Sequence, residues 1–308
     1  MPKIETFTPE WAEYELIDSG AGKKLERFGE FTLVRPEPQA HWKAMLGARR
    51  WHAADGEFVK TREERQGEWK FRKATPARWM MQREHLKFWV RPSPSGHVGV
   101  FPDQACHWDW IGQTIRPARP VKVLCLFGHT GLATLAAAEA GAEVTHVDAS
   151  RKAVAWAREN QSLSGLNSRP IRWIVEDALK FVKREARRGN QYDAMVLDPP
   201  RFGRGPKGEF WKLEKSLPEL LSVCRTLLSP SPLFVLLNIY MTVKNERSEN
   251  EAAGLRLCLT EMLRELDATI TAGELAIEDA AQRKISASVF ARAEFENRRS
   301  TSQRHQRS

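Results

Sequence analysis

The sequence has no long apolar run, no sign of an export signal and few cysteines. Its best apolar stretch, residues 232–237, has the length of one strand, whereas a membrane-spanning helix needs about 20 apolar residues. The first residues contain no basic segment followed by an apolar one, so we expect no secretory signal. The four cysteines lie far apart without a CxxC pair, which argues against a disulfide scaffold or a zinc site. We therefore expect a cytoplasmic protein that does not enter a membrane.

Sequence patterns that bind metals or nucleotide phosphates are also missing. The eight histidines show no metal-ligand spacing, and Cys106-His107 is an isolated pair. We therefore predict that the protein binds no metal. The GxxxxGK[ST] loop that cradles nucleotide phosphates is absent, which disfavours phosphoryl transfer.

Positive charge is in excess. The chain has 48 Lys and Arg against 39 Asp and Glu, a net charge of +9, and its pI is about 9.5. Residues 49–91 hold twelve basic residues against six acids, and the last twelve residues hold four Arg and no acid. This balance favours a polyanionic partner, with nucleic acid the first candidate, although many basic proteins bind no polyanion.

Three zones of the chain differ in composition. Residues 1–90 are basic and Trp-rich, with short strand-like pieces at 31–34 and 58–60, and predict a small β-rich domain. Its interleaved basic and aromatic residues, such as Trp69-Lys70-Phe71-Arg72-Lys73, suit contact with RNA, but the Trp side chains can instead form the core of that domain. Residues 91–293 alternate strands and helices, and residues 294–308 predict a disordered polar tail.

The second zone predicts an α/β fold. Apolar runs predict strands at 121–127, 143–147, 171–175, 192–197, 233–237, 269–276 and 286–292. Helices are expected between the first six of them, at 132–140, 151–163, 178–187, 217–228 and 249–266. Repeated βα units with buried strands imply a doubly wound, mostly parallel sheet of seven strands, Rossmann-like in its layering. The last two strands follow each other without a helix, so we expect one of them to run antiparallel at an edge.

Polar and glycine residues follow the first two predicted strands, where a doubly wound sheet binds its ligand. After the first comes Phe127-Gly128-His129-Thr130-Gly131, whose glycines allow a tight turn and close approach of a ligand. The alternative is a plain connection from strand to helix. After the second comes Asp148-Ala149-Ser150, where the carboxylate is placed to accept hydrogen bonds from two ribose hydroxyls. The alternative is that this Asp caps the next helix.

The third strand ends at Glu176-Asp177-Ala178. A carboxylate there can accept from an adenine amino group, or it can cap a helix. A single nucleoside ligand would account for the polar groups at all three strand ends.

The fourth strand ends at Asp198-Pro199-Pro200-Arg201-Phe202, the most specific pattern in the chain. Two prolines remove two N–H donors and restrict the backbone, which leaves carbonyl oxygens and a carboxylate as acceptors. Such a group suits a planar exocyclic amine, and Phe202 can stack on its ring. The alternative is a rigid loop.

These residues carry a resemblance to a known family. The segments 126–131, 146–150 and 198–203 resemble the class I S-adenosylmethionine-dependent methyltransferases, and more narrowly the bacterial family that methylates large-subunit ribosomal RNA. The segment His97-Val98-Gly99-Val100-Phe101-Pro102-Asp103-Gln104 is similar to one that closes over the cofactor in that family.

The resemblance implies roles for individual residues. It implies S-adenosylmethionine as the cofactor and assigns to its binding Phe101, Gln104, Phe127, Gly128, Thr130, Gly131, Asp148, Ala149, Ser150, Asp177, Ala178 and Asp198. It implies that the methyl acceptor is framed by the catalytic residues Asp198, Pro199, Pro200 and Phe202.

The acceptor is less defined than the cofactor. Relatives that methylate carbon five of cytosine use a cysteine near the end of the fifth strand, where this chain has Leu236-Leu237-Asn238-Ile239-Tyr240. A covalent cysteine mechanism therefore lacks its residue, and transfer to a base nitrogen is favoured. Basic residues after the Asp-Pro-Pro motif, at 201, 204, 207, 212 and 215, suit RNA phosphates or form a solvated loop.

Several other functions stay open. The acceptor can be a cytosine carbon, a small molecule or a protein. A non-catalytic RNA-binding protein can share this fold. A nicotinamide-dependent oxidoreductase is disfavoured because the first turn is GxxG and not GxGxxG.

Overall fold

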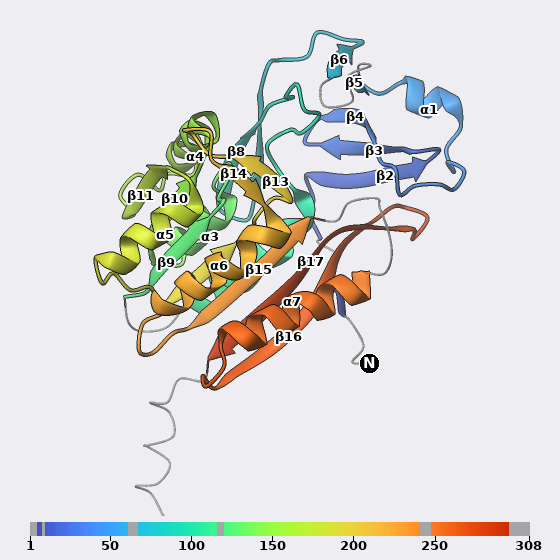
Figure 1. Cartoon of the computed structure of the whole chain (residues 1–308). Helices are drawn as coiled ribbons and strands as arrows, with labels where there is room; N and C mark the ends of the chain where they lie inside the picture. The colour runs from blue at the N-terminus through green and yellow to red at the C-terminus, as the bar shows by residue number, and fades with distance from the viewer. Residues whose placement is uncertain (1–4, 8–9, 61–66, 116–119, 241–247, 296–308) are drawn as a thin grey trace, which may run out of the picture.

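The computed structural model describes residues 5–7, 10–60, 67–115, 120–240 and 248–295. A sheet of eight strands forms the centre of the molecule (Figure 1). Its strands, in sheet order, are β1 (Glu5–Phe7), β16 (Ala268–Glu278), β17 (Lys284–Phe295), β15 (Phe234–Tyr240), β12 (Ala194–Leu197), β9 (Lys122–Leu126), β10 (Glu143–Asp148) and β11 (Ile171–Val175).

The predicted α/β class and its seven mostly parallel strands are confirmed. β9, β10, β11, β12 and β15 pair in parallel, whereas β17 runs antiparallel to both of its neighbours. The expected edge position of the antiparallel strand is wrong, because β17 lies between β15 and β16. A tight turn joins antiparallel strands directly, and the interior place buries residues 287–293 on both faces of the sheet.

Two helical layers cover the sheet. One face carries α2 (Ala105–Ile115), α3 (Leu132–Glu139) and α4 (Arg151–Leu163), and the other carries α5 (Ala178–Arg187), α6 (Leu213–Thr226) and α7 (Ser248–Met262). This arrangement explains why residues 123–126 of β9 are all apolar. Val123 and Cys125 pack in the core beneath α2 and α3, while Leu124 and Leu126 pack in the core beneath α5 to α7. No helix in the described part of the chain is long and apolar enough to cross a membrane.

The N-terminal part is rich in β structure. A five-stranded sheet and a separate hairpin lie beside the large sheet (Figure 1). Their elements are β2 (Tyr14–Gly20), β3 (Lys23–Phe28), β4 (Phe31–Pro36), the short helix α1 (Ala48–His52), β5 (Gly56–Lys60), β6 (Gly67–Phe71), and the hairpin strands β7 (Trp79–Arg83) and β8 (Leu86–Val90). A 3-10 turn, η1 (Pro102–Gln104), leads into α2.

The domain boundaries remain a prediction, and two features of the chain ends depart from them. β1 pairs in parallel with β16 at the edge of the large sheet, although it precedes the N-terminal sheet in sequence. β17 includes residues 294 and 295, the first two of the predicted tail, because they continue its pairing with β16. The rest of that tail, residues 296–308, lies outside the described residues.

Most of the N-terminal Trp side chains serve as core. Trp79 is buried, and Trp11, Trp42 and Trp69 pack partly buried against the same cluster, which also contains Trp108 of α2. The indole N–H groups of four N-terminal Trp donate to backbone carbonyls inside the protein. A buried indole satisfied in this way is a packing group, so the core alternative accounts for these rings better than RNA contact does.

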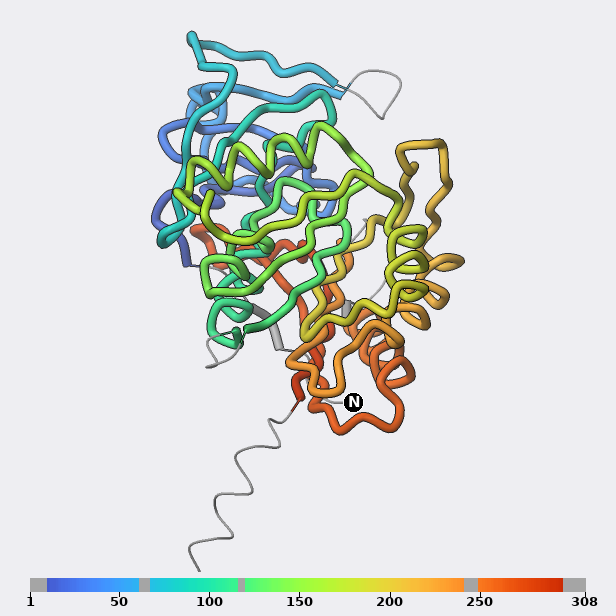
Figure 2. The backbone as a smooth tube through the Cα atoms, turned by 90° about the vertical axis from the view of Figure 1, so that its left-hand side faces the viewer, coloured from blue at the N-terminus to red at the C-terminus, as the bar shows by residue number. Residues whose placement is uncertain are grey.

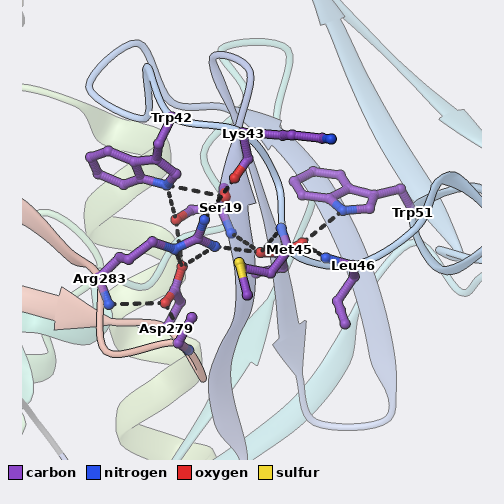
Figure 3. Close-up of polar contacts among 10 residues, drawn as sticks. Ser19, Trp42, Lys43, Met45, Leu46, Trp51, Asp279 and Arg283 are labelled. Carbon is purple, nitrogen blue, oxygen red and sulfur yellow. Dashed lines mark hydrogen bonds and ion pairs between the residues drawn. The ribbon is translucent and has the colours of Figure 1, made fainter.

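A polar junction ties the N-terminal sheet to the large sheet (Figure 3). Asp18 of β2 accepts hydrogen bonds from Leu46 N at 2.8 Å and from Trp51 Nε1 at 3.0 Å. Arg283, in the turn between β16 and β17, reaches Asp18 at 2.5 Å and Asp279 at 2.7 Å. Both carboxylates are buried, so the guanidinium supplies the charge that makes their burial tolerable.

Candidate functional site

A cavity of about 450 Å³ opens at the carboxyl ends of β9, β10, β11 and β12. Parallel strands present their following loops at one edge, which is where a doubly wound sheet forms its ligand site. Most of the residues selected from the sequence line this one cavity. They are Phe101, Gln104, Phe127, Asp148, Ala149, Ser150, Asp177, Ala178, Asp198, Pro199 and Pro200.

Four selected residues lie elsewhere. Gly128 and Thr130 line a smaller adjoining cavity of about 70 Å³, whose wall includes Asp198. Gly131 lines neither cavity; it is the N-cap residue that precedes α3, with a φ of 86°. Phe202 is also outside both, and 61% of its surface is exposed. The structure therefore does not bring Phe202 into the cavity where a base would sit.

The loop after β9 is held in an unusual conformation. A Cβ atom on Gly128 would lie 2.4 Å from Cε1 of the buried His146 ring, so only glycine fits beside that ring. Phe127 and His129, on either side, have φ values of 58° and 47°. Non-glycine residues adopt positive φ rarely, and such strain concentrates at functional sites.

The segment before α2 crosses this loop. Thr130 is buried, and its hydroxyl donates to the Gly99 carbonyl at 2.6 Å. Asn160 of α4 donates to the Thr130 carbonyl at 3.0 Å. The Phe101 ring lies 5.5 Å, centroid to centroid, from His129. These contacts fix Phe101 and Gln104 over the cavity and commit the Thr130 hydroxyl to the fold.

Asp148 at the end of β10 is pre-organised as an acceptor. Its Oδ2 accepts from His129 N at 2.9 Å, and its Oδ1 accepts from Ser150 N at 2.7 Å. Each carboxylate oxygen has a second acceptor position, and the side chain lines the cavity. The carboxylate can therefore take two further donors without moving. Ser150 caps α4 by accepting from Ala153 N at 3.2 Å, so Asp148 is free of that task.

Asp177 caps a helix and also lines the cavity. Its Oδ1 accepts from Lys180 N at 2.9 Å and so caps α5. The same side chain lines the cavity together with Ala178. Glu176, its neighbour, also lines the cavity and pairs with Arg184.

A buried hydrogen-bond chain supports Asp198 at the end of β12. Asp198 Oδ1 accepts from Asn238 Nδ2 at 2.7 Å, and Asn238 Oδ1 lies 3.3 Å from His107 Nε2. On the other side of that ring, His107 Nδ1 lies 2.6 Å from Nη2 of Arg292. A guanidinium can only donate, so His107 Nδ1 accepts and Nε2–H donates to Asn238. The chain thereby directs the Asn238 amide N–H toward Asp198.

Two buried carboxyl groups lie near each other in the wall. Burial raises the pKa of Asp198 to about 7, and the charge of Asp103 raises it further, against the hydrogen bond from Asn238. Burial likewise raises the pKa of Asp103 to about 6, although the Ser288 hydroxyl donates to it at 3.1 Å. Such shifted carboxyls in a cavity mark candidate functional groups.

Several residues of the wall were not selected from the sequence, among them Asp103, Asn238 and Tyr240. Asn238 had a detectable signal, because it is a polar residue at the end of the apolar run that forms β15. Tyr240 and Asp103 also line a neighbouring cavity of about 330 Å³, whose opposite wall comes from β3 and β4 of the N-terminal sheet.

Among the described residues, no three His, Cys, Asp or Glu side chains cluster as a metal site would require. Burial raises the pKa of Cys106 to about 11, of Cys125 and Cys224 to about 12, and of Cys258 above its usual value. A nucleophilic cysteine needs the opposite shift, because the thiolate is the reactive form.

Comparisons with known proteins agree with this geometry. A family model described as S-adenosylmethionine-dependent methyltransferase matches residues 34–239. A crystal structure of the SAM-dependent methyltransferase from Agrobacterium tumefaciens is 42% identical, with a TM-score of 0.89 over 96% of this chain and 94% of that one. A methyltransferase complexed with SAH shares the fold at 18% identity, with a TM-score of 0.65 over 88% of this chain and 71% of that one.

The similarity also reaches enzymes named for ribosomal RNA. The ribosomal RNA large subunit methyltransferase K/L from Aeromonas salmonicida is 31% identical over 208 residues, which is 66% of this chain and 28% of that relative. Its counterpart from Shewanella baltica is 31% identical over 185 residues, 59% of this chain and 25% of that relative. The chain thus spans less than a third of the length of these relatives.

Proposed function

The chain belongs to the S-adenosylmethionine-dependent methyltransferase family, and from this membership we propose that it methylates a base nitrogen in RNA, with large-subunit ribosomal RNA as the substrate. The substrate rests on two observations. The relatives named above are large-subunit ribosomal RNA methyltransferases, and the chain carries a net charge of +9, which suits a polyanion. On the same ground we propose that the protein acts in the cytoplasm.

The residues of the cavity fit the cofactor. The Asp148 carboxylate keeps acceptor positions beyond those that its two backbone amides use, which suits two ribose hydroxyls. Gly128 leaves room for the buried His146 ring, and the first loop, which is held against that ring, lines the cavity through Phe127 and His129. Asp177 and Ala178 form the wall next to Asp148, where an adenine ring would follow the ribose. When bound, S-adenosylmethionine supplies an electrophilic methyl group, which is the difficult part of the chemistry.

The proposal for the methyl acceptor rests on Asp198. It lines the same cavity as Asp148, and the Asn238 amide fixes one of its oxygens. The other oxygen and the carbonyls of the Asp-Pro-Pro segment can accept from an amino group, because prolines contribute no competing N–H. These acceptors would orient the nitrogen lone pair toward the methyl group, and alignment of this kind lowers the barrier strongly. Buried Pro199 and the neighbouring Pro200 restrict the movement of this segment.

Transfer to a base nitrogen is favoured over transfer to cytosine carbon. The carbon reaction needs a cysteine nucleophile, and burial raises the pKa of all four thiols. Among the described residues that line the two cavities, the only cysteine is Cys125, at the smaller cavity. Its pKa of about 12 leaves it protonated at neutral pH.

The test is methyl transfer from labelled S-adenosylmethionine to unmodified ribosomal RNA, followed by mass spectrometry of the nucleosides. We expect label on a base nitrogen. Asp198→Ala should abolish transfer while calorimetry shows nearly unchanged cofactor affinity, and Asp148→Ala should lose cofactor binding. Glu261→Gln serves as a control, because this carboxylate on α7 pairs with Arg264 and does not line the cavity.

Each other outcome contradicts part of the proposal. Label on a cytosine carbon would contradict the choice of nitrogen. Label on protein or on a small molecule, with none on RNA, would contradict the RNA substrate. Cofactor binding without transfer to any acceptor would indicate a non-catalytic member of the fold.

A further inference from the structure

A small hairpin follows the Asp-Pro-Pro segment and has two unlike faces. It consists of β13 (Phe202–Arg204) and β14 (Phe210–Lys212), in which Phe202 lies opposite Lys212 and Arg204 lies opposite Phe210. Opposed residues of an antiparallel pair share a face, and so do residues two apart along a strand. One face therefore carries Phe202, Arg204, Phe210 and Lys212, and we call it the hairpin face.

The hairpin face is exposed, whereas the opposite face is buried. Phe202 and Phe210 are 61% and 67% exposed, which is unusual for two large apolar side chains on one short element. On the opposite face, Trp211 is 4% exposed and its indole Nε1 donates to the Pro200 carbonyl at 2.6 Å. Its ring lies 4.9 Å, centroid to centroid, from Phe127. Trp211 thus anchors the hairpin to the walls of the cavity.

Further contacts fix the hairpin in place. Leu213 N donates to the Arg201 carbonyl at 2.9 Å, and Gly205 N donates to the Glu209 carbonyl at 2.8 Å. Glu209 pairs with Lys180 on α5. In Figure 2 the yellow hairpin of residues 202–212 nevertheless stands away from the helices and the sheet. It is an anchored element that presents two aromatic rings to the surroundings.

The charges on this face are positive. Within the described part of the chain, the side chains of Arg204 and Lys207 have neither an ion pair nor a hydrogen bond. The Lys212 ammonium lies 5.9 Å from the centroid of the Phe202 ring and 3.9 Å from Glu214. Arg204 also lines the 450 Å³ cavity, so the hairpin face continues to the rim of the site.

We propose that the hairpin face binds single-stranded RNA beside the methylated base. Two nucleotides next to that base stack on Phe202 and Phe210, and their phosphates lie against Arg204 and Lys212. Alternating rings and cations match the alternating bases and phosphates of a single strand, and they suit neither a purely apolar nor a purely anionic partner. This inference rests on the proposed function, because it takes RNA as the acceptor. It also means that Phe202 stacks on a nucleotide beside the methylated base and not on that base itself, since the Phe202 ring lies outside the cavity.

The test measures binding of a fluorescein-labelled single-stranded RNA oligonucleotide by anisotropy, at several salt concentrations. Phe202→Ala and Phe210→Ala should each weaken binding at least about fivefold, because stacking on a ring contributes on this scale. Lys212→Gln should reduce the slope of log affinity against log salt by about 0.7, as expected for one lost phosphate contact on a single strand.

Matched controls come from α7. Leu257 is 68% exposed and Arg256 is exposed on the same helix, away from the cavity residues. Leu257→Ala and Arg256→Gln should leave both RNA affinity and salt slope unchanged. Calorimetry with S-adenosylmethionine on Phe210→Ala and Lys212→Gln checks folding, because neither residue lines the cavity and both variants should bind the cofactor as the wild type does.

The outcomes separate this inference from the proposed function. RNA affinity that is unchanged in both Phe variants overturns the inference, even where the wild type methylates RNA. Weakened binding in these variants supports it, even where the wild type transfers no methyl group to RNA. A wild type that binds no single-stranded RNA overturns it outright.

Discussion

Substituting Gly128 with alanine should destabilise the protein through a single contact. The new Cβ would lie 2.4 Å, 2.5 Å and 3.2 Å from Cε1, Nδ1 and Nε2 of His146. This ring is fully buried, its Nδ1 lies 2.9 Å from the Thr134 hydroxyl, and its centroid is 4.7 Å from that of Trp173. Because its neighbours confine the His146 ring, displacing it costs free energy, and the clash must distort the loop.

The expected size follows from overpacking. Extra atoms in a packed core cost about 1–3 kcal/mol. Unfolding entropy of about 2.1 cal/mol/K per residue means that each kcal/mol lowers Tm by about 1.5 °C in a chain of 308 residues, so Gly128→Ala should melt about 1.5–5 °C below the wild type. The assay is thermal unfolding followed by circular dichroism, with calorimetric titration of S-adenosylmethionine on the same samples. Affinity should also fall, because the distorted loop forms part of the cavity wall.

A second substitution tests the cause. His146→Ala removes the ring that Gly128→Ala would strike, so the double variant should lose less stability than the two single losses added, by at least about 0.5 kcal/mol. Gly112→Ala is the control, because a Cβ at this helical position meets nothing within 4 Å and alanine favours a helix by about 0.5–1 kcal/mol. Wild-type stability in Gly128→Ala, or strict additivity in the double variant, would refute the reasoning.

Three further predictions address the cavity and the polar junction. Asp148→Asn should weaken S-adenosylmethionine binding about 10- to 150-fold in calorimetry, since hydrogen bonds to a charged group contribute about 1.5–3 kcal/mol; unchanged affinity would contradict its role. Methyl transfer should rise as pH increases through about 7, where Asp198 becomes a carboxylate, and a pH–rate profile of Asp198→Asn should lack this rise. Arg283→Met should cost about 3–5 kcal/mol in urea unfolding at pH 7, because it leaves the carboxylates of Asp18 and Asp279 buried without their cation. Burial raises the pKa values of Asp18 and Asp279, but hydrogen bonds, including those from Arg283, lower them below the usual value. The stabilisation from the ion pairs is therefore present at neutral pH, and the stability difference between Arg283→Met and the wild type should shrink on acidification. A stability difference that grows as the pH falls would contradict this account.

The regular elements of the large sheet could be read from local sequence. Residues 151–163, 171–175 and 178–187 form α4, β11 and α5 within the boundaries predicted for them. Each boundary had a local cause, such as the Ser150 side chain that caps α4. The strand ends were equally readable, because a parallel arrangement places the segments after β9, β10, β11 and β12 at one edge whatever their side chains are.

Other features depended on partners distant in sequence. The sequence predicted an antiparallel strand but not that β17 inserts between β15 and β16, because its flanking pattern does not encode which neighbours it meets. The place of Phe202 was decided by the register of β13 on β14, which directs its ring to solvent. The support that Asn238 gives to Asp198 arises only when β15 and β12 pair.

The sequence by itself determined seven of the eight strands of the large sheet, the helices between them and the edge at which their polar ends gather, because burial patterns and helix capping act between near neighbours. The tertiary structure alone decided which of those polar groups meet. Asp18 and Arg283 are separated by 265 residues, and the His146 ring reaches Gly128 only across two paired strands. Contacts of this kind depend on which side chains meet when distant segments of the chain pack together, and a local sequence pattern does not contain that information.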